Sequence, residues 1–154
     1  MAEVAAFPVP PVVKRVTVGL DQAQAFERFT GGLGSWWPLH SHSRSGKAAS
    51  CAFEPRVGGR LYERTEDGEE MVWGQVEIWE PPARVSFTWQ VGNVPQGQHI
   101  EVTFTPAGVG RTEVVLTHSG WESLGEEALR GRERYDNGWE AVFIRAYGGT
   151  AAVG

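Results

Sequence analysis

The stretch Glu133–Tyr147, ERYDNGWEAVFIRAY, is the only segment of the chain whose apolar residues keep a sustained helical repeat. These residues recur at intervals of three or four, at Tyr135, Trp139, Val142, Phe143, Ala146 and Tyr147. The spacing predicts an α-helix of about four turns with one apolar face. That face needs a partner, and the rest of the sequence offers the face of a β-sheet.

Most of the chain before this stretch predicts short strands. Apolar and polar residues alternate with period two in much of residues 50–118, and Asp67-Gly68 is a typical hairpin turn. The expected strands are Val12–Leu20, Cys51–Glu54, Arg60–Thr65, Met71–Glu80, Val85–Trp89, Ile100–Thr105 and Thr112–His118. Asp21, with Gln24 three residues later, predicts the capped start of a short helix after the first strand.

The length of 154 residues predicts one domain over residues 12–154. Residues 1–11 contain Pro8, Pro10 and Pro11 and predict an extended leader, since proline donates no hydrogen bond to a sheet. Cys51 is the one cysteine, so no intramolecular disulfide can form. Because the sequence has no signal-peptide pattern and no long apolar run, we expect a soluble cytoplasmic protein without a membrane partner.

The charge pattern argues against a nucleic-acid partner. The formal net charge is −5, and lysine and arginine form no block. Nucleic-acid binding depends on clustered basic side chains that neutralise phosphates. The seven Trp and seven Phe residues are more than a small core commonly uses, which indicates an apolar site.

Four motifs together resemble the START-like (SRPBCC) superfamily, in particular its branch of activator of heat-shock-protein-90 ATPase homologues of the single-domain bacterial type. They are Glu54–Arg60 (EPRVGGR), Gly74–Glu80 followed by two prolines, Phe87–Trp89 (FTW) and Leu116–Trp121 (LTHSGW). The resemblance implies an α+β helix-grip fold, in which a curved antiparallel sheet of about seven strands wraps around a long C-terminal helix. Short helices would follow the first strand. Known members include lipid carriers, aromatases, cyclases and co-chaperones, so the fold alone does not give the function.

A helix-grip fold implies a cavity between the sheet and the long helix. The residues expected to line it are Trp36, Trp37, Val76, Ile78, Phe87, Trp89, Val102, Phe104, Leu116, Trp139 and Phe143. About 300 Å³ of dry void would cost on the order of 7 kcal/mol, which rivals the stability of a domain. Either the aromatic side chains fill this space, or a ligand or water does. The leading hypothesis is a protein without enzymatic activity that binds a small hydrophobic molecule, aromatic or lipid-like.

An enzyme is the alternative, of the polyketide aromatase, cyclase or hydrolase kind. His118 shares strand parity with Leu116 and could face the cavity, and Glu63 could face it from another strand. These two residues would form an acid–base pair. If Tyr62 points inward instead, Arg60 or Arg64 becomes the inward charge.

The sequence does not predict a metal or another cofactor. His40 and His42 form a close pair, with Cys51 and His99 as further candidates, but a zinc site needs four suitably spaced ligands. The glycines do not have dinucleotide-binding spacing. No cofactor is therefore expected.

A third hypothesis is a protein-binding role, as a homodimer or with a chaperone partner. Trp73 and Trp79 share the parity of the outer sheet face, and an exposed aromatic pair is typical of an interface. In the alternative, the N-terminal leader covers them.

Overall fold

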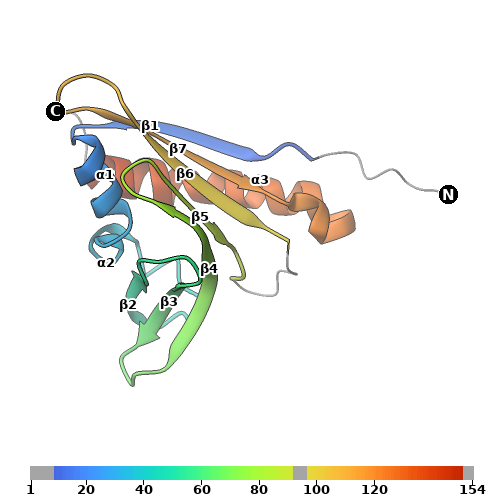
Figure 1. The fold of residues 1–154 in the computed structure, drawn as a ribbon. Helices are drawn as coiled ribbons and strands as arrows, with labels where there is room; N and C mark the ends of the chain where they lie inside the picture. The colour runs from blue at the N-terminus through green and yellow to red at the C-terminus, as the bar shows by residue number, and fades with distance from the viewer. Residues whose placement is uncertain (1–8, 92–96, 151–154) are drawn as a thin grey trace.

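The computed structural model describes residues 9–91 and 97–150, which form a seven-stranded antiparallel sheet with a long helical segment beside it (Figure 1). The predicted α+β helix-grip fold is confirmed. Residues 1–8 of the predicted leader lie outside the described residues.

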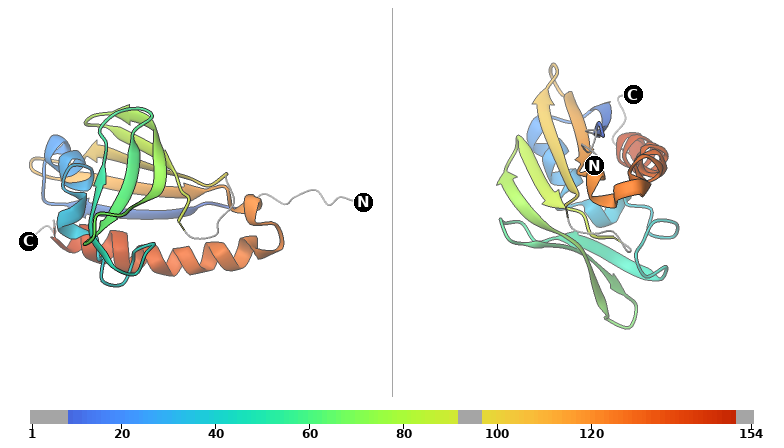
Figure 2. Two further views of the ribbon diagram at one scale, coloured as in Figure 1. Left: turned by 90° about the horizontal axis from the view of Figure 1, so that it is seen from below. Right: turned by 90° about the vertical axis from the view of Figure 1, so that its right-hand side faces the viewer.

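The sheet runs in the spatial order β1-β7-β6-β5-β4-β3-β2. Its strands are β1 (Val12–Val18), β2 (Ala48–Phe53), β3 (Arg60–Thr65), β4 (Glu70–Glu80), β5 (Arg84–Thr88), β6 (His99–Pro106) and β7 (Thr112–Ser119). Strands β2 to β7 form a meander, and β1 joins it beside β7. Figure 2 shows that the sheet curves around the long helix, so the concave face and the helix enclose the core.

Two short helices follow β1, α1 (Gln22–Phe29) and α2 (Leu33–Trp36). The predicted cap is present, since Asp21 Oδ1 accepts from the Gln24 backbone N–H at 2.8 Å and Gln24 Oε1 accepts in return from the Asp21 backbone. The glycines after Thr30 interrupt the helix, but one more helical turn forms before Pro38. Figure 1 shows both helices at one end of the sheet.

The C-terminal segment begins with the 3₁₀-helix η1 (Trp121–Glu127). The helical backbone then continues without a break through α3 (Ala128–Trp139), the π-helix η2 (Glu140–Tyr147) and α4 (Gly148–Thr150). Trp139, Val142, Phe143 and Tyr147 of the predicted apolar face are buried, so the helix and its inward face are confirmed, although its second half is π-helical.

Polar contacts fix this helix to the rest of the fold at its middle and near its C-terminal end. Lys14 Nζ of β1 lies 3.1 Å from an Asp136 carboxylate oxygen and 2.8 Å from one of Glu140. Near the C-terminal end, the Tyr147 hydroxyl donates to the Ala25 carbonyl oxygen of α1 at 2.8 Å. The helix is therefore held against β1 and against the short helices at the same time.

Two bulges change which residues of β4 face the core. Opposite β3 the partner changes from Gly74 to Val72, and opposite β5 it changes from Val76 to Ile78, so Trp73 and Glu77 are the extra residues. Because each bulge reverses the alternation of faces, strict period two fails along β4.

The bulges overturn two predictions. Trp73, expected on the outer face, is 1% exposed, and Trp79 is half-buried with its ring centroid 5.1 Å from that of Phe26. The predicted exposed pair of tryptophans does not exist. Ile78, expected to point inward, pairs with Ser86 on the opposite face of the sheet from Val85 and Phe87.

Gly74 lies between the two bulges and is required there. A Cβ atom at this position would lie 1.8 Å from the Thr88 carbonyl oxygen, so β4 and β5 approach each other too closely for any side chain.

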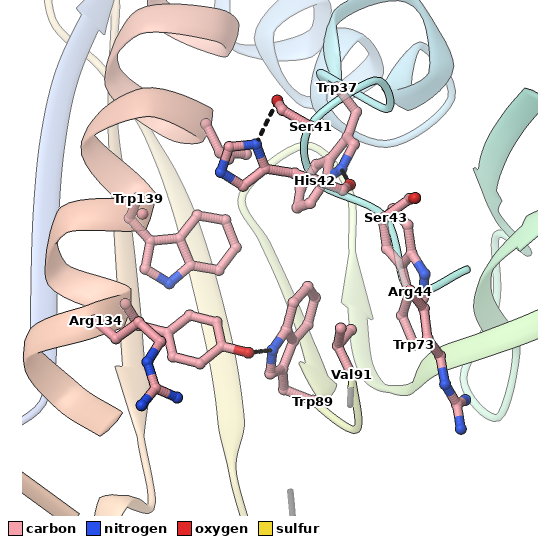
Figure 3. Close-up of a pocket in the computed structure, with 13 residues that line it drawn as sticks. Trp37, Ser41, His42, Ser43, Arg44, Trp73, Trp89, Val91, Arg134 and Trp139 are labelled. Carbon is pink, nitrogen blue, oxygen red and sulfur yellow. Dashed lines mark hydrogen bonds between the residues drawn. The ribbon is translucent and has the colours of Figure 1, made fainter. Parts of the chain in front are cut away.

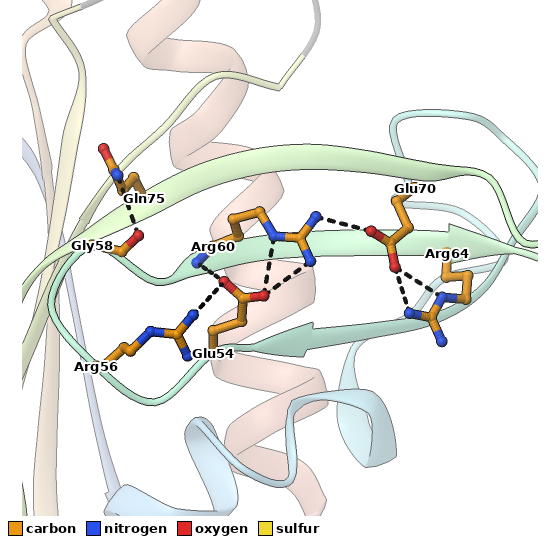
Figure 4. A network of polar contacts seen from close by, with 7 residues as sticks. All are labelled: Glu54, Arg56, Gly58, Arg60, Arg64, Glu70 and Gln75. Carbon is orange, nitrogen blue, oxygen red and sulfur yellow. Dashed lines mark hydrogen bonds and ion pairs between the residues drawn. The ribbon is translucent and has the colours of Figure 1, made fainter.

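The outer face of β3 and β4 carries a chain of ion pairs (Figure 4). The Arg60 guanidinium bridges Glu54 and Glu70, at 2.9 Å in each case, and Arg64 also contacts Glu70. Since Arg60 and Arg64 lie outside, Glu63 between them points inward, where it is buried. The choice between Glu63 and Tyr62 as the inward residue is settled in favour of Glu63.

Candidate ligand-binding site

A pocket of about 300 Å³ lies between the loop after α2, the ends of β4 and β5, and α3 with the start of η2 (Figure 3). Its lining residues are Trp37, Ser41, His42, Ser43, Arg44, Trp73, Trp89, Val91, Arg134, Tyr135, Gly138, Trp139 and Val142. The side chains of Ser41, Arg44 and Arg134 are exposed, so the pocket is open to water on this side.

Four indoles from four separate segments form most of the wall. Trp37 follows α2, Trp73 is the first bulge residue of β4, Trp89 follows β5, and Trp139 ends α3. The Trp37 ring lies at centroid distances of 4.9 Å from Trp73, 6.3 Å from Trp89 and 6.0 Å from Trp139. These are ordinary distances for tilted and edge-to-face aromatic pairs, so the four rings support one another around the cavity.

Each of the four indole N–H groups already has an acceptor within the protein. The donor–acceptor pairs are Trp37 with the His42 carbonyl oxygen (2.6 Å), Trp73 with Glu63 Oε1 (2.6 Å), Trp89 with the Tyr135 hydroxyl (3.0 Å), and Trp139 with His118 Nδ1 (3.0 Å). Indole has a single donor and no acceptor. The tryptophans therefore offer a ligand only apolar ring surface.

Glu63 lies behind Trp73 and is fully buried. Its carboxylate accepts from the backbone N–H groups of Arg44 and Ser45 as well as from the Trp73 indole. Burial raises the pKa of Glu63, but hydrogen bonds from Ser45, Arg44 and Trp73 outweigh that effect and hold the pKa below its usual value. An ionised Glu63 thus fastens the pocket loop to β4.

His118 lies behind Trp139 and is also fully buried. Since the Trp139 indole donates to Nδ1, the proton of the neutral ring is on Nε2, which lies 2.8 Å from Gln98 Oε1. Burial lowers the pKa of His118 to about 3. Trp121 packs over this ring at a centroid distance of 4.2 Å.

The LTHSGW motif brings about the contact between Trp121 and His118. Gly120 has a φ of +90°, and a Cβ atom there would lie 1.9 Å from the Gly97 carbonyl oxygen. The chain can therefore turn back tightly only with glycine, which brings Trp121 onto His118.

The predicted acid–base pair is not formed. Glu63 and His118 are both buried, but each lies behind a different indole, so neither lines the pocket as the enzyme hypothesis requires. Both ring nitrogens of His118 are engaged by other side chains, so this histidine acts as a structural acceptor and donor.

The loop after α2 supplies the polar side of the pocket. His42 Nδ1 lies 2.8 Å from Ser41 Oγ, and Arg44 Nη1 donates to the Val72 carbonyl oxygen at 2.7 Å. Arg134 of α3 reaches the same cavity. Among the described lining residues, Arg44 and Arg134 are cationic and none is a carboxylate, so the charged groups that border the opening are both positive.

The observed cavity is shorter than the predicted one. Of the predicted lining residues, Trp37, Trp89 and Trp139 border the pocket. The others except Ile78 are buried in the core instead: Trp36, Val76, Phe87, Val102, Phe104, Leu116 and Phe143.

Aromatic packing fills that part of the fold. The Phe29 ring lies 5.2 Å from Trp36, 6.0 Å from Phe104, 6.3 Å from Phe143 and 5.3 Å from Tyr147, between ring centroids. Aromatic side chains therefore occupy the space between the sheet and η2 around Phe29, and the pocket lies beside α3 and the start of η2.

Sequence reasoning missed several lining residues. Trp73 lies on the opposite face of the sheet from the predicted one, and the loop residues Ser41 to Arg44 were not among the predicted lining residues. Tyr135 was assigned to the helix stripe but not to the pocket. The sequence feature that could have identified this loop as pocket lining is its position, as a segment of small polar residues that closely follows Trp36 and Trp37.

The candidate metal ligands are separated. His42 contacts Ser41, and His99 Nδ1 lies 2.8 Å from a Glu77 carboxylate oxygen. Burial, followed by the charge of Glu63, raises the pKa of the Cys51 thiol to about 12. Over residues 9–91 and 97–150, no three His, Cys, Asp or Glu side chains gather in a way that could hold a metal ion.

Within the described part of the chain, no helix has both the length and the apolar character needed to span a bilayer.

Comparison with known proteins gives a family and several similar folds. The family model described as Activator of Hsp90 ATPase homolog 1-like protein matches residues 22–146. The solved structure of an anthrahydroquino-gamma-pyrone synthase, Txn09, is 39% identical and has a TM-score of 0.56, with 84% of this chain and 88% of that chain covered. No curated protein matches the chain.

Two further structures extend the comparison. The self-sacrificing resistance protein CalC from Micromonospora echinospora is 26% identical, with a TM-score of 0.69 and coverage of 92% of this chain and 94% of that chain. An HSP90 activator from Plasmodium falciparum is 17% identical, with a TM-score of 0.63 and coverage of 92% and 96%, which shows the shared fold alone.

Proposed function

We propose that this chain, which belongs to the family of Activator of Hsp90 ATPase homolog 1-like proteins, binds a small planar aromatic molecule in the indole-walled pocket. One observation carries the proposal. Four indoles border an open cavity of about 300 Å³ while all their N–H groups are bonded elsewhere. Such a wall favours a flat ring system, through burial of apolar surface and aromatic packing.

The size of the pocket supports a small ligand. Small-molecule sites usually range from roughly 300 to 1,000 Å³, so this one is at the lower end. Its flat rings suit an aromatic molecule better than a flexible lipid chain, because rigid stacked surfaces lose less conformational entropy on binding.

The charged residues at the opening of the pocket, which form its rim, favour an acidic or hydroxylated ligand. Arg44 and Arg134 border the cavity, and no carboxylate lines it among the described residues. Positive charges at a partly enclosed opening attract anions and repel cations. A ligand with its rings between the indoles and a carboxylate or phenolate at the rim meets both conditions.

Titration calorimetry with 2-naphthoate tests the proposal. Gly138 lines the pocket, and a Cβ atom there meets nothing within 4 Å, so Gly138→Leu would fill the cavity without a clash at Cβ. We expect wild-type protein to bind 2-naphthoate and Gly138→Leu to bind it at least tenfold more weakly, with unchanged or higher stability because glycine disfavours helix.

The matched control is Gly149→Leu, another helical glycine with open space at Cβ but outside the pocket. This variant should bind like wild type. Equal affinity in Gly138→Leu and Gly149→Leu would remove the pocket from consideration.

An enzyme acting on an aromatic substrate is the second candidate. It is favoured by the 39% identity to a protein described as a synthase. Glu63 and His118 cannot serve such an enzyme as a facing pair, since each is held behind an indole. Any acid–base chemistry must therefore come from the rim.

A chaperone partner and a homodimer remain predictions, and the surface that was proposed for them is not exposed. The similar HSP90 activator shares the fold only, and the tryptophans proposed as an interface face inward or are half-buried.

A further inference from the structure

We propose that His42 exchanges a proton with a hydroxyl group of the aromatic ligand, so that the pocket performs acid–base chemistry in addition to binding. This inference rests on the proposed function, since it needs an aromatic molecule in the pocket. It is carried by the position of His42, which lines the cavity from the loop side (Figure 3).

The backbone of His42 is fixed on both sides. Its N–H donates to the Pro38 carbonyl oxygen at 2.9 Å, and its carbonyl oxygen accepts from the Trp37 indole at 2.6 Å. Two residues further on, the Arg44 N–H is held by the buried Glu63 carboxylate. The imidazole therefore stands on a loop that is anchored before and after it, which is what a group acting on a bound molecule requires.

The ring of His42 has one engaged and one open nitrogen. Nδ1 lies 2.8 Å from Ser41 Oγ, whereas Nε2 has no hydrogen-bond partner within residues 9–91 and 97–150. His42 lines the cavity and is half-buried, and Nε2 is the ring nitrogen left to bond a molecule bound there.

Ser41 suits both protonation states of this ring. Its hydroxyl can donate to an unprotonated Nδ1, or it can accept from Nδ1–H while donating to the Pro38 carbonyl oxygen at 3.4 Å. In the second arrangement Nε2 carries a free lone pair, and after it gains a proton the Nδ1–H bond to Ser41 is retained.

The proton transfer is balanced within the pocket. The ligand O–H bond breaks, its electron pair stays on oxygen as an aryloxide, and the proton goes to Nε2 to form an imidazolium. The reverse step returns the proton to the ligand. Histidine is the side chain best suited to such exchange near neutral pH.

The other charged and titratable groups facing His42 favour the ion pair. Arg44 from the same loop and Arg134 from α3 are cations that stabilise an aryloxide. Tyr135 of α3 also faces the cavity, with its hydroxyl accepting from the Trp89 indole. Because no carboxylate lines the pocket among the described residues, the imidazolium has the ligand oxygen as its counter-ion.

The test uses 7-hydroxycoumarin, whose phenol and phenolate forms absorb at different wavelengths. At about pH 7, where the free dye is mostly a phenol and imidazole is mostly unprotonated, we expect the dye bound to wild-type protein to show the phenolate band. His42→Gln should bind the dye more weakly, and with the dye saturated by protein it should show the phenol band. His40→Gln is the matched control, since His40 is an exposed loop residue outside the pocket lining, and it should behave like wild type.

Two results would overturn the inference while the proposed function stands. One is a bound dye that stays a phenol in wild-type protein. The other is a phenolate band of equal strength in wild type and His42→Gln, which would assign the effect to the arginines. If neither the dye nor 2-naphthoate binds, the proposed function fails and this inference fails with it.

Discussion

The polar residues around the pocket form two regions, which differ in whether their hydrogen-bonding groups have partners within the protein. The inner layer (Glu63, Gln98 and His118) is fully buried and lies behind the indoles. The rim (Ser41, His42, Arg44 and Arg134) borders the cavity itself. Glu63 and both nitrogens of His118 are bonded to other protein groups, whereas His42 Nε2 is open.

This difference shows that a buried ionisable residue near a pocket is not necessarily reactive. Burying a polar group destabilises a protein unless the group is hydrogen-bonded. The hydrogen-bonding groups of the inner layer are therefore used to stabilise the fold. The Gln98 amide nitrogen is the one inner-layer atom left unpaired in the described chain. The rim is in contact with water, so its hydrogen-bonding groups can stay free to bind a ligand. Stability effects should therefore concentrate in the inner layer and binding effects at the rim.

The largest effect is expected for Glu63→Leu. It leaves two backbone N–H groups and the Trp73 indole without an acceptor in a buried place. Each buried donor left without an acceptor costs about 1–3 kcal/mol, so urea unfolding should show a decrease of several kcal/mol.

Glu63→Gln is the control for this prediction. It keeps one acceptor oxygen and similar volume, so it should lose less stability than Glu63→Leu. Equal, small losses in both variants would mean that the inner layer does not hold the loop.

The second effect is a pH dependence that originates from His118. Its pKa is about 3 in the folded protein and about 6.5 when unfolded, so the unfolded state binds more protons in between. The stabilisation is fully present above about pH 6.5 and is lost progressively as the pH falls towards 3. The free energy of unfolding should fall by up to about 1.4 kcal/mol per pH unit.

Urea unfolding between pH 7 and 5 measures this slope, because Glu63, with its lowered pKa, stays ionised there. His40→Gln, at the exposed loop, should keep the slope. A free energy of unfolding that is flat over this range would show that His118 is not held neutral by the inner layer.

The smallest stability effect is expected at the rim, for Arg134→Gln. Arg134 is exposed, so the free energy of unfolding should change by less than about 0.5 kcal/mol. Affinity for 2-naphthoate should fall up to about tenfold, and affinity for the neutral 2-naphthalenemethanol should stay the same, because only the anion uses the charge.

Calorimetry at low and high salt completes this comparison, since the charge-dependent part of binding weakens as salt rises. The exposed Arg130→Gln, on the same helix and outside the pocket lining, is the control and should leave both affinities unchanged. A stability loss in Arg134→Gln as large as that in Glu63→Leu would erase the distinction between rim and inner layer.

The strands and the long helix could be predicted because their signals are local. The stripe from Tyr135 to Tyr147 and the alternation in β5, β6 and β7 depend on side chains that one face of one element must bury. Prediction failed in β4, because a bulge leaves no mark in the alternation until its partner strands are known. Trp73 and Ile78 were assigned to the wrong faces for this reason.

The sequence by itself determined the strands, the inward face of the long helix and the aromatic character of the interior, since burial of apolar side chains with period two or 3.6 is a local requirement. The helix-grip arrangement of these elements was implied by the resemblance to a known family. Only the tertiary structure decided where the interior stays open and which histidine borders it. His118 is enclosed by Trp139, Trp121 and Gln98, and His42 reaches the cavity from a loop without periodicity. Which groups satisfy one another depends on contacts between distant segments, and no local pattern contains that information.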